Sequence, residues 1–150
     1  MFISDDDGNL LININLDTIF IGYNTGFLKN FQPGSNERLW EIPAHRGNIN
    51  CIFVNPNYIL TGGQDGILRV WTRTTHELTI QFSAHHKDTL MVFPDMNKPN
   101  LIYTCGGDRN LNCFDLKLHK RVNLHSLKNG TLTGIAQRKD DNNEISKIYY

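Results

Sequence analysis

The stretch that decides the fold is Thr61-Gly-Gly-Gln-Asp-Gly-Ile-Leu-Arg-Val-Trp71, a strand end, a tight Gly/Asp turn and a strand closing on an aromatic residue. Forty-three residues later, 104–114 repeats it as Thr-Cys-Gly-Gly-Asp-Arg-Asn-Leu-Asn-Cys-Phe. A weaker copy forty residues upstream, at 21–31, keeps two glycines, a leucine and the closing aromatic. Internal repeats with a period of about 40–45 residues indicate stacked units of supersecondary structure.

Each unit contains several short strand-like segments. In the clearest unit, apolar side chains alternate along 49–53 and 78–82, and segments 58–61 and 67–71 lie between them. Four strands in about 40 residues make one blade of a β-propeller. The sequence therefore predicts an all-β fold, a partial propeller of about three and a half four-stranded antiparallel blades. The predicted blades span approximately 9–43, 44–83, 84–125 and, in part, 126–150.

The last predicted blade begins with a strand at 132–136, followed by a polar loop at 137–143. The final residues, 144–150, again have the composition of strands. Three and a half blades would leave apolar blade faces open, because four to eight blades close a ring. We therefore expect the chain to be part of a larger propeller, or to be completed by another copy or another protein.

Composition excludes several classes of function. Fifteen basic and fifteen acidic residues cancel, so no overall positive field favours nucleic acid. Three cysteines without a Cys-x-x-Cys pair predict buried thiols in a reducing compartment. The start, 1–7, is acidic where a signal peptide is basic and apolar, and no apolar run reaches the ~20 residues of a membrane span. We expect a cytoplasmic protein that binds neither nucleic acid nor membrane.

The repeats resemble those of WD40 proteins, most clearly over 44–121. The family pattern has a Gly-His or similar pair before the innermost strand, an Asp in the following turn and a Trp-Asp pair ending the third strand. The matching residues of the second unit are Ala44-His45, Asp65 and Trp71-Thr72, and those of the third are Ala84-His85-His86, Asp108 and Phe114-Asp115. The first unit departs from the pattern with Thr25 and Phe31, and the fourth has Lys128 near the expected histidine.

The resemblance implies a structural tetrad in the second blade, formed by His45, Thr61, Asp65 and Trp71. The competing interpretation, a Thr-His-Asp nucleophilic triad, has no oxyanion hole or cleft to support it. In the third blade the corresponding network is predicted as His86, Thr104, Asp108 and Phe114. Because phenylalanine offers no indole N–H, the third blade should be the less stable of the two.

Four other motifs have weaker interpretations. The glycine-rich turn 62–66 precedes a strand and not the helix that a phosphate loop requires, so we predict a hairpin turn. His85-His86 with Asp88 lacks a further metal ligand, and Asp5–Asp7 lacks the rest of a calcium loop. Cys105 and Cys113 should lie on neighbouring strands as free thiols. We predict no cofactor and no metal.

Binding residues are expected in loops, because a rigid scaffold presents loops to partners. In the family geometry, the loop before each inner strand and the turn between strands two and three emerge on one face. The polar residues placed there are the candidate partner-binding residues: Asn24, Arg46, Asn48, Gln64, Lys87 and Arg109. The opposite face would carry Asn55, Asn57, Asp95, Lys98 and Asn100.

The leading functional hypothesis is a non-catalytic protein–protein interaction scaffold within a larger assembly. Eighteen asparagines suggest an AT-rich coding genome, as in many ciliated or flagellated single-celled organisms. We therefore expect a cytoskeletal setting on a ciliary axoneme. The alternatives are an adaptor in a ubiquitin-ligase, trafficking or ribosome-assembly complex, and a propeller-fold enzyme. An enzyme would need converging acidic, histidine or metal-ligand groups at the central channel, and the inner strands offer none.

Overall fold

The structure is a computed structural model that describes residues 10–15, 18–35, 37–130, 136–139 and 145–149. Of 10–15, 136–139 and 145–149 it describes the backbone alone. The described residues contain strands, turns and loops but no helix, so none of them belongs to a helix that could cross a membrane.

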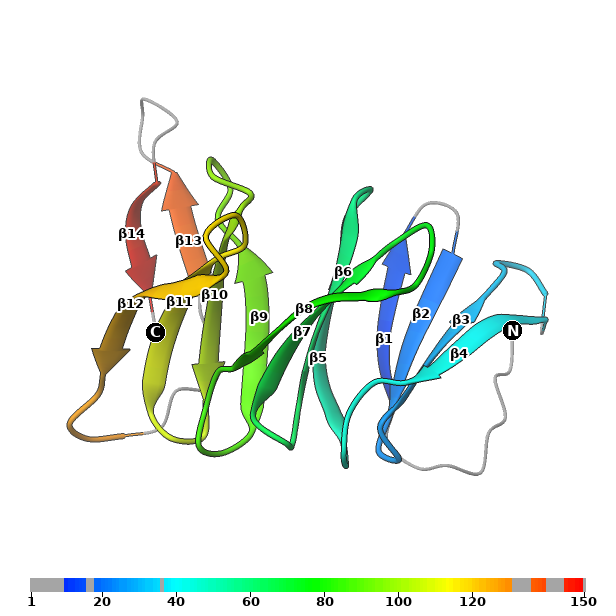
Figure 1. Ribbon diagram of the computed structural model, residues 1–150, viewed down its shortest axis with the longest axis horizontal. Helices are drawn as coiled ribbons and strands as arrows, with labels where there is room; N and C mark the ends of the chain where they lie inside the picture. The colour runs from blue at the N-terminus through cyan, green and yellow to red at the C-terminus, as the bar shows by residue number, and fades with distance from the viewer. Residues whose placement is uncertain (1–9, 16–17, 36, 131–135, 140–144, 150) are drawn as a thin grey trace.

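Three four-stranded antiparallel sheets stand side by side along the long axis of the molecule (Figure 1). In each sheet the strands pair in chain order, so every blade is a simple meander. Blade one contains β1 (Leu10–Asn15), β2 (Thr18–Tyr23), β3 (Phe27–Phe31) and β4 (Arg38–Pro43). Blade two contains β5 (Ile49–Val54), β6 (Tyr58–Gly63), β7 (Ile67–Thr72) and β8 (Leu78–Ser83). Blade three contains β9 (Thr89–Pro94), β10 (Leu101–Gly106), β11 (Asn110–Asp115) and β12 (Lys120–Ser126).

A two-stranded sheet of β13 (Ala136–Lys139) and β14 (Ile145–Tyr149) follows the third blade. The prediction of a loop from 137 is therefore wrong for Gln137 to Lys139, which pair with β14. Strand pairing uses backbone groups, so a hairpin tolerates polar side chains that a loop would also accept. The predicted strand at 132–136 lies outside the described residues except for Ala136.

The core lies between the blades. Between blades one and two, a buried cluster joins Phe20 and Leu28 to Ile49 and Trp71. Between blades two and three, a second cluster contains Cys51, Leu60, Leu68, Val70, Ala84, Val92, Ile102 and Phe114. The blades therefore stabilise one another by face-to-face burial of apolar side chains, the non-directional driving force of folding.

The third strand of each blade shifts register against the outer strand just before its closing aromatic residue. The shifts lie before Phe31, Trp71 and Phe114. A bulge at this position increases the local twist. The outer strands β4, β8 and β12 consequently cross in front of the inner strands in Figure 1.

Candidate functional site: a histidine–aspartate network beneath a loop face

The four side chains predicted to meet in blade two lie in one hydrogen-bonded chain. The His45 Nδ1 atom is 2.8 Å from Asp65 Oδ1, and His45 Nε2 is 2.8 Å from the Thr61 hydroxyl. The Trp71 indole N–H donates to the same hydroxyl over 3.0 Å. Since Thr61 accepts from Trp71, its own proton can go to His45 Nε2, and Nδ1–H then donates to Asp65.

This arrangement places the histidine in its neutral form. Burial lowers the pKa of His45 below its ordinary value of 6.5, although the hydrogen bond to Asp65 acts in the opposite direction. Burial alone would raise the pKa of Asp65, but hydrogen bonds from Arg69 and His45 hold that pKa below its usual range. A charged carboxylate and a neutral imidazole therefore share the site.

A fifth residue of blade two, Arg69, belongs to this network and is absent from the predicted tetrad. Its Nη1 atom lies 2.8 Å from Asp65 Oδ2 and 2.8 Å from His45 Nδ1. Because Nδ1 carries the ring proton, we assign the Arg69 hydrogen bond to the carboxylate. The outer end of the clamp is thus an Asp–Arg ion pair, and its side chains are only 9% and 15% exposed.

The network of blade three uses His85 and not His86, which corrects the prediction. The His85 Nδ1 atom is 2.8 Å from Asp108 Oδ1, and His85 Nε2 is 2.9 Å from the Thr104 hydroxyl. His86 is exposed and gives only its backbone N–H to Asp108, over 3.1 Å.

Backbone register is the reason for this choice. The amides of Ala84 and His85 both donate to Gly66 O, as those of Ala44 and His45 donate to Gly26 O. The residue directly after the alanine is therefore the one whose ring turns inward.

Two positions distinguish blade three from blade two. Phe114 replaces the tryptophan, and its ring stacks on Phe82 with centroids 4.5 Å apart, so Thr104 receives no indole donor. Asn112 occupies the place of Arg69 and donates to Ala84 O over 2.8 Å, with the same amide nitrogen 3.4 Å from His85 Nδ1. A neutral amide therefore replaces the cation of blade two.

Glycines make room for both histidine rings. A Cβ added at Gly63 would lie 2.5 Å from His45 Cγ, and one at Gly106 would lie 2.4 Å from His85 Cγ. Blade one has Tyr23 at the matching position, fully buried, with Lys29 Nζ 4.2 Å from its ring centroid. The third-strand position of Arg69 and Asn112 is thus polar in all three blades. Alignment of the repeats would show that this position is polar, but not that its side chain joins the network.

The network does not have the accessibility of a nucleophilic triad. Thr61 is fully buried, and its hydroxyl already contacts both His45 and Trp71. Thr104 is likewise fully buried against His85. A substrate could not reach either hydroxyl without opening the blade, so the geometry supports a clamp that holds the turn to the preceding loop.

The clamps lie beneath a surface that we call the loop face, formed by loops 44–48, 84–88 and 127–130 and turns 24–26, 64–66 and 107–109. Backbone hydrogen bonds join these segments in alternation: Gly26 O accepts from His45 N, Asn48 O from Gln64 N and Gly66 O from His85 N. Asp88 O accepts from Gly107 N, and Arg109 O from Leu127 N. The face is consequently one connected surface across three blades.

The six candidate partner-binding residues all lie on the loop face. Five of them are exposed: Arg46, Asn48, Gln64, Lys87 and Arg109. Asn24 is only half-exposed, and its Oδ1 atom is buried. The Gln64 side chain accepts from the backbone of Asn48 over 3.3 Å, which links a turn to the loop beside it.

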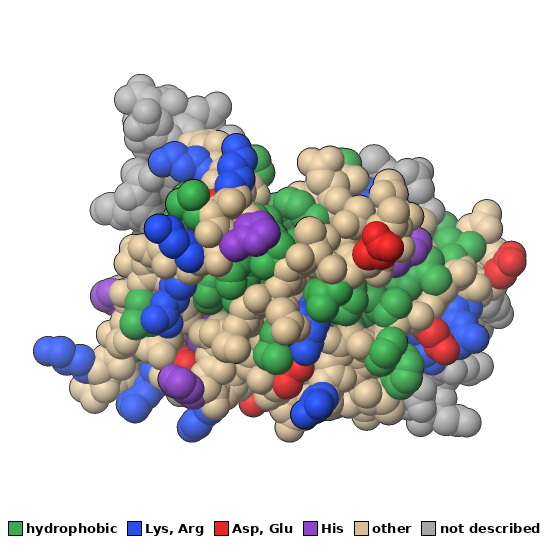
Figure 2. All heavy atoms as spheres, in the orientation of Figure 1, with side chains coloured by type: hydrophobic (Ala, Val, Ile, Leu, Met, Phe, Trp, Pro, Cys, Tyr) green, Lys and Arg blue, Asp and Glu red, His purple; other side chains and the backbone are tan. Residues whose placement is uncertain are grey.

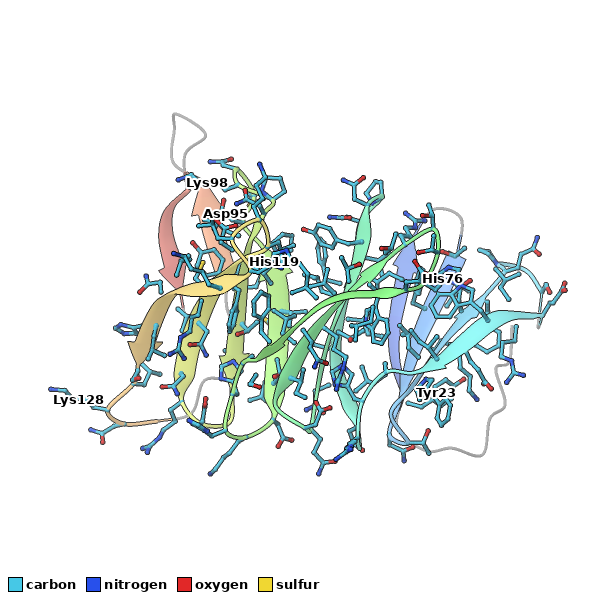
Figure 3. All side chains as sticks on the ribbon, in the orientation of Figure 1. Tyr23, His76, Asp95, Lys98, His119 and Lys128 are labelled. Carbon is cyan, nitrogen blue, oxygen red and sulfur yellow. The ribbon has the colours of Figure 1, made fainter. Side chains whose placement is uncertain are left out.

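The opposite end of the blades is built from Asx turns. Asp95 is buried and accepts from the backbone N–H groups of Asn97 and Lys98 and from the Tyr103 hydroxyl. Figure 3 shows Asp95 and Lys98 at one end of blade three and Lys128 at the other. Asp95 is therefore a structural residue and not a surface group.

The cysteines are buried and free. Cys105 and Cys113 lie on the paired strands β10 and β11, opposite Leu111 and Tyr103 respectively and not opposite each other. Burial raises the pKa of each thiol to about 11, so both stay protonated. Within the described part of the chain, no group of three or more histidine, cysteine or acidic side chains could hold a metal ion.

The meandering four-stranded sheets, stacked face to face and clamped by His–Asp–Thr networks, define a repeat protein of the β-propeller class. The family model for the WD domain, G-beta repeat, matches residues 36–72. Over these residues the chain resembles the repeats of WD40 proteins.

Two curated relatives match parts of the chain. Periodic tryptophan protein 2 homolog of Dictyostelium discoideum is 27% identical over 91 residues, 59% of this chain and 10% of the relative. Protein SOF1 of Saccharomyces cerevisiae is 25% identical over 103 residues, 60% of this chain and 21% of the relative. The chain spans only a small part of either relative's length. That further blades or a second chain complete the ring stays a prediction.

Solved structures share the fold. The crystal structure of the computationally designed Ika4 protein matches with a TM-score of 0.81 at 13% identity, over 99% of this chain and 95% of that chain. The designed Ika8 protein matches with a TM-score of 0.76 at 16% identity, over 87% of this chain and 40% of that chain. A chain in the crystal structure of the Mitotic Checkpoint Complex matches with a TM-score of 0.72 at 16% identity, over 77% of this chain and 38% of that chain. These similarities confirm the predicted partial propeller.

Proposed function

We propose that this chain is a non-catalytic protein–protein interaction scaffold that binds its partner through the loop face. The observation that carries this proposal is the alternating backbone hydrogen bonding of loops and turns across three blades. It fixes the backbone of loops from different blades in one surface, and such pre-ordering lowers the entropic cost of binding. The buried networks hold that surface and take no chemical part in binding.

A triple variant tests the proposal. Arg46→Ala, Gln64→Ala and Lys87→Ala together remove three exposed side chains from the loop face. A matched control removes exposed side chains at the opposite end, with Lys98→Ala, Lys117→Ala and Thr74→Ala. Partners recovered by affinity purification with the wild-type chain should be lost with the first variant and kept with the control. Equal recovery with both variants, when both are folded by circular dichroism, would place the binding site elsewhere.

The setting of the scaffold is a separate proposal. Neither curated relative is named as a cytoskeletal or ciliary protein, so the ciliary expectation has no support among them. The similarity instead favours the alternative, an adaptor in a complex such as one of ribosome assembly. A cytoplasmic location likewise stays a prediction.

Density-gradient fractionation of a lysate with the tagged chain distinguishes these settings. Co-sedimentation with pre-ribosomal particles that is lost after RNase treatment supports the ribosome-assembly adaptor. Recovery of the chain in purified axonemes, with none in the pre-ribosomal particle fractions, would instead support the ciliary setting.

A further inference from the structure

The charges of the molecule are unevenly distributed, although its net charge is zero. Residues 84–130 carry seven Lys and Arg against four Asp, a net charge of +3. All seven cationic side chains belong to exposed residues, whereas none of the four aspartates does. The seven are Lys87, Lys98, Arg109, Lys117, Lys120, Arg121 and Lys128. Among side chains that the structure describes, exposed carboxylates occur only in blades one and two, at Glu37, Glu41 and Glu77.

Three of these cations lie on neighbouring segments of the loop face. Lys87 lies against the turn of blade three, since a Cβ added at Gly107 would be 3.5 Å from Lys87 Cβ. Leu127 N donates to Arg109 O over 3.0 Å, which places Lys128 beside the same turn. Figure 3 shows the Lys128 side chain extending into solvent, and Figure 2 shows Lys and Arg side chains along this edge.

The carboxylate of the turn that carries Arg109 is turned inward. Asp108 accepts hydrogen bonds from His85, from the backbone N–H groups of His86 and Asn110, and from the Asn110 side chain. Burial alone would raise the pKa of Asp108, but the hydrogen bonds from His86 and His85 hold it below its usual range, so its charge is already satisfied. Asp88 is half-exposed and is the one remaining acid in loop 84–88. The outer layer of this surface is therefore positive.

Arg109 supplies an independent observation. It has a φ of 66°, whereas the equivalent residue of blade two is Gly66 with a φ of 74°. A side chain in the left-handed region is unfavourable, by about 1 kcal/mol, for residues other than glycine. Strained residues cluster at functional sites, so the strain at this exposed cation agrees with a binding role.

We infer that the loop face of blade three binds an acidic peptide segment, with Lys87, Arg109 and Lys128 as its cationic contacts. This rests on the proposed function and names the chemistry of the partner. A carboxylate-rich segment fits better than nucleic acid, because the molecule has no overall positive field. Unpaired bases stack on exposed aromatic rings. Among the large exposed hydrophobic side chains of the described residues, only Phe27, in blade one, is aromatic.

Fluorescence anisotropy on the full chain tests the inference, with a labelled peptide of alternating Glu and Ser as the probe. Its neutral counterpart, with Gln for Glu, is the first control, and a labelled single-stranded RNA is the second probe. The test variant is Lys87→Ser with Lys128→Ser, and the matched variant at the other end of blade three is Lys98→Ser with Lys117→Ser. All four positions are exposed, so each variant changes the charge equally.

The acidic peptide should bind, and the loop-face variant should weaken binding about tenfold while the matched variant changes it less than about twofold. Binding should also weaken between about 50 mM and about 300 mM salt, as screening of exposed charges requires. No binding of the acidic peptide, an equal loss in both variants, or tighter binding of the RNA would overturn the inference. If partner capture still depends on Arg46, Gln64 and Lys87 in that case, the scaffold function stands without the acidic ligand.

Discussion

Blades two and three are built on the same His–Asp–Thr network but end it differently. In blade two the network continues to an indole donor at Trp71 and to the cation of Arg69. In blade three it ends at Thr104, and a ring stack between Phe114 and Phe82 takes the place of the indole hydrogen bond. The histidine, aspartate and threonine are common to both networks. We therefore expect the closing aromatic residue and the third-strand residue, Arg69 or Asn112, to set how stable each blade is.

The largest expected effect comes from removing the carboxylate of each network. Asp65→Ala should destabilise the chain by about 3 kcal/mol and Asp108→Ala by about 2 kcal/mol, because each leaves buried donors unpaired. The difference arises from Arg69, which loses its ion pair only in blade two. Urea unfolding followed by circular dichroism measures both values. A larger loss for Asp108→Ala would reverse the comparison.

Acid should weaken both blades together. The pKa values of His45 and His85 are lower in the folded chain, mainly because of burial. Both rings therefore bind protons more readily on unfolding, and stability is lost as pH falls below about 6.5. The depressed pKa values of Asp65 and Asp108 add a further loss at lower pH, as the carboxylates become protonated.

Thermal unfolding measured from about pH 7.5 to about pH 5.5 reports the histidine contribution. A double variant, His45→Gln with His85→Gln, should start from a lower midpoint but show a flatter dependence on pH. An equally steep dependence in the double variant would mean that other groups cause the acid sensitivity.

The closing aromatic can be exchanged to make blade two resemble blade three. Trp71→Phe removes the donor to Thr61 and leaves the ring buried, so we expect a loss of about 1–2 kcal/mol. The reference substitution is Phe114→Leu, which tests ring packing without a hydrogen bond. A Trp71→Phe variant as stable as the wild type would show that the indole N–H contributes nothing.

The smallest expected effect is a gain in stability. Arg109→Gly should stabilise the chain by about 0.5 kcal/mol, since relief of the positive φ slightly exceeds the added entropy of the unfolded chain. The comparison variant Gly66→Arg places the same strain in blade two and should be destabilising, because a Cβ there would lie 2.3 Å from His85 O. Destabilisation by Arg109→Gly would mean that the arginine side chain itself supports the turn.

The blades could be predicted from the sequence because their turns need particular residues. The Gly-Gly-x-Asp-Gly turn and its copies predicted strand order, blade number and the members of the blade-two network. The sequence could not show whether His85 or His86 belongs to the network of blade three. Both residues are histidine, and the one that turns inward depends on which amides donate to Gly66 O. The sequence prediction also missed Arg69 and Asn112, whose polarity on a third strand resembles that of a solvated position until burial is known. The strand at Gln137 was missed because its side chains are polar while strand pairing uses the backbone.

Native-state hydrogen exchange tests most directly whether the extended network holds blade two more firmly than blade three. The amides of β6 and β7 should exchange more slowly than those of β10 and β11, and Trp71→Phe should remove most of the difference. Exchange that is equal in the two blades, or slower in blade three, would contradict the account.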